Sequence, residues 1–252
     1  MLIWSVVRGF LYPFLGTVLG SSFVFFMKKE PGKRLMVFLD SFAAGIMCAA
    51  AFFSLISPAV SQAETEGEIS LLFCTVGFFV GIGVFVLTEK LLLILLGKSG
   101  NSANLLLWAV SIHNIPEGLA VGVIYSGLLY GTTDVNLSAA VSLSLGIAMQ
   151  NIPEGAIVSL PLKTRGMKQS KAFFSGLISA AAELISGVFA LFLFSFSNRI
   201  LPFSMCLAAG AMFYVILAEL SDHFSDKKTS PGALSVFAMG FCLMMMLDTF
   251  LG

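Results

Sequence analysis

Two stretches of the chain share the sequence Asn-Ile-Pro-Glu-Gly: Ser111-Ile112-His113-Asn114-Ile115-Pro116-Glu117-Gly118 and Ala148-Met149-Gln150-Asn151-Ile152-Pro153-Glu154-Gly155. Both lie within long apolar runs, where an ionisable residue costs about 2.5–3.5 kcal/mol on membrane-insertion scales. Because residues four apart share one face of a helix, His113 is expected over Glu117, and Gln150 over Glu154. These polar pairs predict a functional site inside a membrane.

The composition agrees with a membrane protein. Of the 252 residues, 58% are hydrophobic and 11% are charged, whereas soluble domains carry about 25% charged residues. Fourteen basic and fourteen acidic residues give a net charge of zero, so nothing in the charge balance suggests a nucleic-acid partner. A spanning helix needs about 20 residues, which leaves room for roughly eight spans and no separate soluble domain.

Hydropathy predicts one all-α transmembrane domain over residues 1–252, with eight spans. They are expected near 7–27, 36–60, 70–96, 103–128, 137–161, 171–196, 200–220 and 233–251. Assigning the loops alternately to two sides leaves only Arg8 and Arg199 on one side, against twelve lysines and arginines on the other. By the positive-inside rule the basic side is cytoplasmic, so both termini are expected outside.

Other residues of the spans have structural interpretations. Pro116 and Pro153 are expected to bend their helices beside the polar residues, and Gly118 and Gly155 to let neighbouring helices approach closely. The cysteines, which lack a C-x-x-C spacing, are predicted to be buried apolar fillers. They are Cys48, Cys74, Cys206 and Cys242. Asp40, Asp134 and Asp248 are attributed to solvated span ends.

The buried acids need a counter-charge, and no lysine or arginine lies within the fourth or fifth span. A divalent cation would supply it. Imidazole, carboxylate and amide groups suit zinc and other first-row ions, whereas the absence of thiolate disfavours copper(I) and iron–sulfur sites. Glu183 in the sixth span follows three alanines and is the best additional acid, with Met47 and Asp40 in the second span as weaker candidates.

The paired motifs, with eight spans and outward termini, resemble the ZIP (Zrt/Irt-like protein) family of divalent-metal transporters, and Gln150 resembles its bacterial GufA-like branch. The resemblance implies a 3+2+3 arrangement in which spans one to three and six to eight are inverted repeats. It also implies a binuclear metal centre bridged by Glu117 and Glu154. One metal would use His113, Glu117, Gln150 and Glu154 with Met47 nearby; the other would use Asn114, Asn151, Glu117, Glu154 and Glu183.

The resemblance implies zinc import into the cytoplasm by alternating access. Cadmium, iron and manganese are expected as further ions, and no resident cofactor is expected. Glu89, Glu219 and His223 are candidates for an exit path. A metal channel and a proton-coupled solute carrier stay open as alternatives, while the lack of H-E-x-x-H argues against an enzyme. We expect a bacterial inner-membrane location, and a homodimer stays open.

Overall fold

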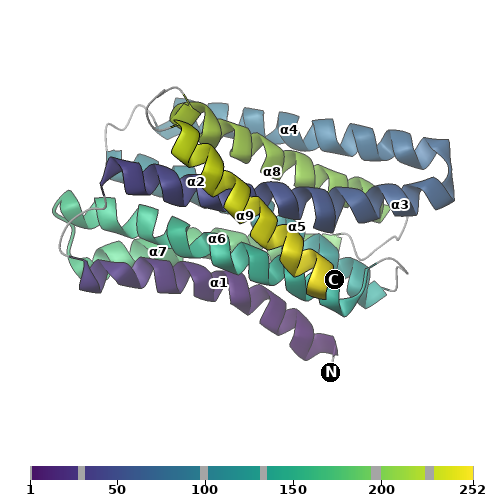
Figure 1. Cartoon of the computed structure of the whole chain (residues 1–252), viewed down its shortest axis with the longest axis horizontal. Helices are drawn as coiled ribbons and strands as arrows, with labels where there is room; N and C mark the ends of the chain where they lie inside the picture. Colours follow the sequence, from purple (N-terminus) through teal and green to yellow (C-terminus); the bar gives the residue numbers. More distant parts are fainter. Residues whose placement is uncertain are drawn as a thin grey trace.

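The computed structural model describes residues 2–27, 32–96, 102–130, 135–193, 200–224 and 230–251, without the side chains of 96, 102–106, 222–224 and 230. Within these residues the regular structure is entirely helical (Figure 1). The helices are α1 (Leu2–Phe26), α2 (Lys33–Ala50), the π-helix η1 (Ala51–Ile56), α3 (Ser57–Glu66), α4 (Glu68–Leu96), α5 (Ser102–Tyr130), α6 (Leu137–Thr164), α7 (Gln169–Leu193), α8 (Leu201–Phe224) and α9 (Ser230–Leu251).

Seven segments of the described chain are long and apolar enough to cross a membrane, counting α2, η1 and α3 as one segment, Lys33–Glu66. The remaining long helix, α6, has 28 residues but a lower hydropathy, because it carries Gln150, Asn151 and Glu154. Large apolar side chains on the outer helices are exposed, as on α4 at Leu72 and Phe79. Such a surface suits lipid, so the predicted all-α, multi-pass membrane fold is confirmed.

Two glycines with positive φ end helices where the chain reverses. Gly67, with φ of 107°, separates α3 from α4, and Gly166, with φ of 91°, follows the end of α6. A residue without Cβ adopts this left-handed conformation at little cost. The spans expected at 36–60 and 70–96 leave residues 61–69 between them, but helix α3 continues to Glu66 and α4 begins at Glu68, so the break is much shorter than expected.

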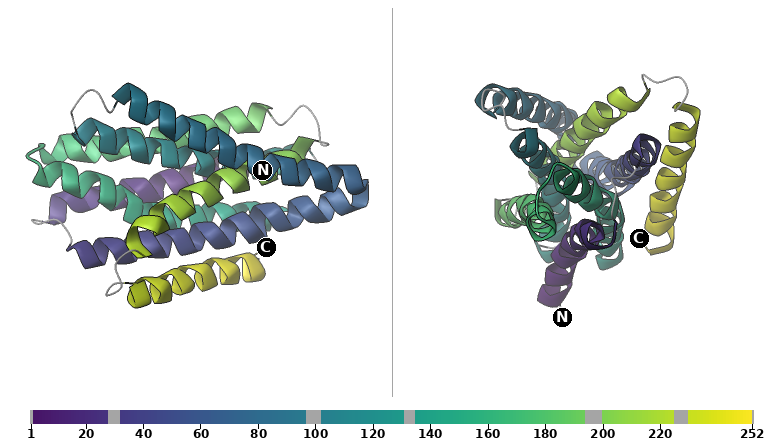
Figure 2. Two further views of the ribbon diagram at one scale, coloured as in Figure 1. Left: turned by 90° about the horizontal axis from the view of Figure 1, so that it is seen from above. Right: turned by 90° about the vertical axis from the view of Figure 1, so that its left-hand side faces the viewer.

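The eight longest helices of the described chain, all except η1 and α3, form two groups of four. The most extensive contacts join α1 with α6, α5 with α7, α4 with α8, and α2 with α9. In Figure 1, α1, α6 and α7 lie below α2, α4 and α8, and Figure 2 shows α4 and α9 on the outside of the bundle. We call α1, α5, α6 and α7 the motif group, and α2, α4, α8 and α9 the outer group.

The pairing has an internal symmetry. The symmetry relates α1, α2 and α4 to α7, α8 and α9, in that order, and α5 to α6. Under this exchange the α1–α6 pair becomes the α7–α5 pair. The same exchange turns the α4–α8 pair into the α9–α2 pair. Spans five apart run in opposite directions across a membrane, so this pattern agrees with the predicted inverted repeat. The N-terminal end of α1 and the C-terminal end of α9 also lie toward the same end of the bundle (Figure 1).

Small residues hold each pair at backbone distance. On α1, a Cβ at Gly16 or Gly20 would collide with the backbone oxygens of Ala148 or Ile152 on α6. At the far end of this pair, the Lys163 ammonium donates to the carbonyls of Val24 (2.8 Å) and Met27 (2.6 Å). A cation at the C-terminal end of a helix is favoured by the helix dipole. α1 and α6 are therefore fastened along their length.

Candidate metal centre

The repeated motifs lie on α5 and α6, and both helices continue through their prolines, Pro116 and Pro153. Most of the polar side chains are removed from the surface: Asn114 and Glu117 are 1% exposed, and Gln150 and Asn151 are fully buried. The motifs therefore bring polar groups into the interior, where each needs a hydrogen-bond partner or a counter-charge.

The glycine of each motif brings in a further helix. A Cβ at Gly118 would collide with the backbone oxygen of Glu183 and with Ser186 Oγ on α7. Without that Cβ, α7 packs against the first motif with the Glu183 side chain buried. The second motif is equivalent, since Gly155 packs against the backbone oxygen of Thr17 on α1. The close approach expected at these two glycines is thus present.

Both asparagine amides are tied through their nitrogen atoms. Asn151 Nδ2 donates to Glu183 Oε2 at 2.8 Å and to the Pro13 carbonyl at 3.2 Å. Asn114 Nδ2 donates to Ser179 Oγ at 3.2 Å. An amide whose nitrogen is held in this way presents its oxygen in a fixed direction. The two Oδ1 atoms are therefore oriented acceptors.

Buried acceptor oxygens without a hydrogen-bond partner define the centre. Seven such oxygens belong to the motif residues and Glu183: Asn114 Oδ1, Glu117 Oε1 and Oε2, Gln150 Oε1, Asn151 Oδ1, Glu154 Oε2 and Glu183 Oε1. Leaving buried acceptors unpaired costs about 1–3 kcal/mol each, and more for charged groups. Because nearly all the unpaired atoms are acceptors, a cation would satisfy them together.

The carboxylates of the centre are electrostatic neighbours. Glu117 interacts with Glu154 and Glu183, and Gln150 lies beside it. Glu154 also interacts with Asp40 on α2. Like charges in a buried setting repel strongly, so a divalent ion would remove both the repulsion and the unpaired oxygens.

His113 contacts an acid on a different helix. Its Nδ1 atom lies 3.7 Å from Glu219 Oε1 on α8, in the outer group. The imidazole thus bridges the motif group and the outer group. Accordingly, no three His, Cys, Asp or Glu side chains of the described residues converge on one ion position. A site here needs the amide oxygens as ligands.

The other predicted residues lie in different surroundings. Met47 is buried in the main hydrophobic cluster. Glu89 on α4 accepts a hydrogen bond from Tyr214 on α8, and Glu219 faces Glu117 and Glu154 as well as His113. The side chain of His223 is outside the described residues. So are Asp134 and several charges used to predict the topology: Lys28, Lys29, Lys98, Arg199, Lys227 and Lys228.

Asp248 on α9 has a role that the sequence did not reveal. Its Oδ1 accepts a hydrogen bond of 2.9 Å from Ser54 in η1. Both residues line a cavity of about 310 Å³, whose wall also includes Ser57 and Asn136. π-Helical turns are frequent at functional sites. The sequence did carry a signal, because Asp248 is an acid inside the span expected at 233–251. It was attributed to a solvated span end.

Comparison with known proteins identifies the protein family. A family model described as ZIP Zinc transporter matches residues 96–248, which include α5 to α8 and both motifs. The chain belongs to the ZIP zinc transporter family.

Individual relatives agree with this assignment. The chain is 39% identical to the zinc transporter ZIP11 of Homo sapiens over 156 residues, 62% of this chain and 45% of that protein. It is 30% identical to ZIP11 of Xenopus tropicalis over 94% of each chain. It is 33% identical to the zinc transporter GufA of Myxococcus xanthus, over 62% of this chain and 59% of that one. The matched part thus spans less than half of the human relative.

Proposed function

We propose that this ZIP protein carries divalent metal cations across the membrane, with zinc as the first substrate and import into the cytoplasm as the direction. One observation carries the proposal: seven buried acceptor oxygens without partners belong to side chains of α5, α6 and α7, whose carboxylates interact with one another. The relatives named above are zinc transporters, which supports zinc for this chain.

Two neighbouring metal positions would share Glu117 and Glu154. The first uses His113 and Gln150, with Met47 close by; the second uses Asn114, Asn151 and Glu183. The contacts favour the second position, because both asparagine amides are anchored with their oxygens free. The first position requires His113 to leave Glu219.

Transport would proceed by alternating access, with the motif group moving against the outer group. Helix pairing supports this division, because the most extensive contacts lie within each group. His113 and Glu219 face each other across the boundary. Exchange of His113 between Glu219 and a metal ion would couple ion binding to that movement.

The path to the centre would begin at the cavity of Asp248, whose carboxylate and serine hydroxyls attract a hydrated cation. On the predicted topology this cavity is on the outer side, with both termini. After the centre, Glu219 would receive the ion on its way out, because it interacts electrostatically with Glu117 and Glu154. Glu89, tied to Tyr214, and His223 would serve closer to the cytoplasm.

Zinc shares this ligand chemistry with other ions. Carboxylate and amide oxygens also suit manganese and iron(II), and cadmium is a further companion. We propose no resident cofactor and no enzymatic activity. A bacterial inner membrane is the proposed location, which relatives such as the bacterial GufA support. A homodimer is compatible with the exposed apolar helices.

Two alternative functions make different predictions. A metal channel would use the same ligands but conduct without a saturable cycle. A proton-coupled solute carrier would leave His113 and both asparagines unexplained, and its uptake would not need metal. Replacing His113 by alanine separates metal transport from solute transport, since only the first requires the imidazole.

Equilibrium zinc binding to the purified protein tests the proposal. We expect tight binding by the wild type and its loss in Glu117→Gln, which keeps the shape of the side chain but removes its charge. Glu64→Gln, on the exposed end of α3, is the matched control and should bind as the wild type does. Equal binding by all three proteins would refute a metal site at the motifs.

A further inference from the structure

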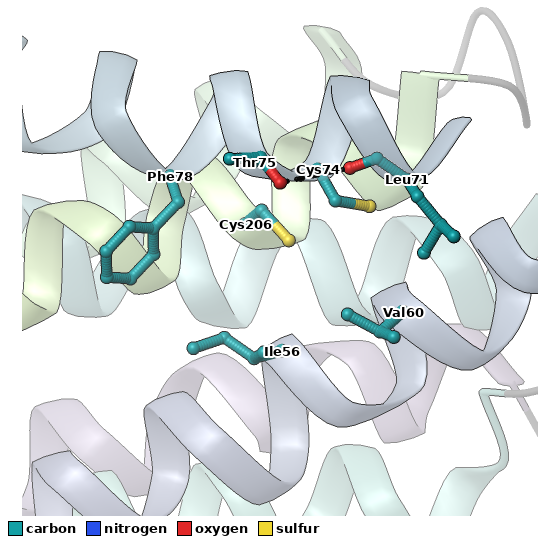
Figure 3. A pocket seen from close by; sticks show the side chains of 7 residues that line it. All are labelled: Ile56, Val60, Leu71, Cys74, Thr75, Phe78 and Cys206. Carbon is teal, nitrogen blue, oxygen red and sulfur yellow. Dashed lines mark hydrogen bonds between the residues drawn. The ribbon is translucent and has the colours of Figure 1, made fainter. Parts of the chain in front are cut away.

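Cys74 on α4 and Cys206 on α8 are neighbours, although they lie far apart in the sequence. Each is 3% exposed, and the two thiols lie near enough to interact electrostatically. Figure 3 shows both side chains pointing into one cavity. The sequence predicts isolated buried cysteines, so the pairing is a consequence of the fold.

The backbones that carry the two cysteines are in contact beside them. One turn after Cys74, a Cβ at Gly77 would lie 2.5 Å from the carbonyl oxygen of Phe203. Further along, Gly210 packs in the same way against the backbone oxygen of Phe78. A disulfide requires Cα atoms about 4.4–6.8 Å apart. Helices in backbone contact bring Cα atoms at facing positions toward this separation.

The cavity gives a reagent room to reach the sulfur atoms. It has a volume of about 330 Å³ and lies between η1, α3, α4 and α8 (Figure 3). Apart from Thr75 its other walls are apolar, with Ile56, Val60 and Leu71 beside the cysteines. Cys74 Sγ makes a weak hydrogen bond of 3.7 Å to the Ala59 carbonyl. The lining therefore admits an uncharged molecule.

We propose that Cys74 and Cys206 form a dithiol that closes to a disulfide between α4 and α8, with an uncharged small-molecule disulfide as oxidant. One cysteine loses its proton and attacks the reagent, forming a mixed disulfide and releasing one thiol. The other cysteine, also deprotonated, attacks the mixed disulfide and releases the second thiol. The protein loses two electrons and two protons, and the reagent becomes two thiols.

The position of the pair limits its effect. Both cysteines belong to the outer group, so the disulfide links two helices that stay together in the proposed alternating-access movement. It should stabilise the α4–α8 pair by restricting the unfolded chain, while metal uptake is retained. On the proposed topology both cysteines lie near the outer ends of their helices, toward an oxidising compartment in a bacterium.

The test uses the full-length protein in liposomes, with Cys48 and Cys242 replaced by serine so that only the pair remains. The protein is treated with dipyridyl disulfide, which is neutral, and then with a maleimide, digested, and analysed by mass spectrometry. We expect a Cys74–Cys206 cross-linked peptide and background maleimide labelling of both residues. The further variants C74S and C206S should give no cross-link.

Two results would overturn the proposal. One is dipyridyl or maleimide modification of both cysteines without a cross-link; the other is a pair that stays reduced until the protein is denatured. Helical circular dichroism of C74S and C206S serves as the folding control. A second readout is Tm, which should rise by several degrees on oxidation of the pair and stay constant in C74S.

Discussion

Asn151 on α6 donates a 2.8 Å hydrogen bond to the carboxylate of Glu183 on α7. This bond joins the second motif to an acid on a different helix. It leaves Asn151 Oδ1 and Glu183 Oε1 as free acceptors. The same contact that stabilises the α6–α7 packing therefore orients two ligands of the proposed metal centre.

Replacing Asn151 by alanine should weaken both stability and binding. Loss of the bond to Glu183 leaves a buried carboxylate with fewer partners, a cost of about 1–3 kcal/mol. Zinc affinity should fall about tenfold or more, as with other residues that orient ligands. Asn136→Ala is the control, because it removes a helix cap through the bond to Ala139 N. Asn136→Ala should lower Tm without altering the affinity for zinc. If Asn151→Ala and Asn136→Ala bind zinc equally well, Asn151 does not orient the ligands.

The motif glycines predict a contrast between two alanine substitutions. Gly118→Ala would push Cβ into the Glu183 carbonyl and Ser186 Oγ, an overpacking that costs about 1–3 kcal/mol. Gly83→Ala on α4 meets nothing within 4 Å, and alanine favours a helix over glycine. Thermal unfolding in detergent should therefore show a lower Tm for the first variant and an unchanged or higher Tm for the second. A Tm for Gly118→Ala that matches the wild type would contradict the packing of α7 on the motif.

His113 and Glu219 should have separable roles. His113→Ala removes a proposed ligand, so zinc affinity should fall by at least about tenfold, or ~1.4 kcal/mol. Glu219→Gln removes the partner of His113 but no ligand, so affinity should be kept or improved while uptake slows. Binding titrations and uptake rates of the two variants measure this. Unchanged affinity in His113→Ala would remove the imidazole from the site.

Asp248 should affect uptake mainly at low metal concentration. Asp248→Asn keeps the bond to Ser54 but removes the charge that attracts a cation, so uptake at low zinc should fall about tenfold. Uptake at saturating zinc should change little, which appears as a raised KM with constant kcat. A drop in kcat alone would place Asp248 in the conformational cycle instead of the approach path.

Sequence patterns predicted the features that depend on local chemistry. Apolar run lengths gave the helical membrane fold, and the spacing of Glu117 and Glu154 on matching helix faces indicated a polar centre. The two motif glycines also behaved as expected, because a missing side chain has the same consequence in any close helix pair. These inferences need only helix geometry and the cost of burying charge.

Features that depend on contacts between distant helices were not predictable. The contact of His113 with Glu219, more than a hundred residues away, had no signal in the sequence. Cys74 and Cys206 looked like separate fillers, and Asp248 looked like a solvated span end. Each depends on which helices pack together and in which register, and hydropathy carries no such information.

Zinc uptake into proteoliposomes tests the central claim most directly. Wild-type protein should take up zinc with saturation, and both Glu117→Ala and Glu154→Ala should abolish uptake, whereas Glu64→Gln should leave it unchanged. Competition by cadmium, iron(II) and manganese would then rank the ions. If folded, inserted wild-type protein takes up no zinc, or if the two alanine variants take it up at the wild-type rate, the buried motifs are not a metal-transport site.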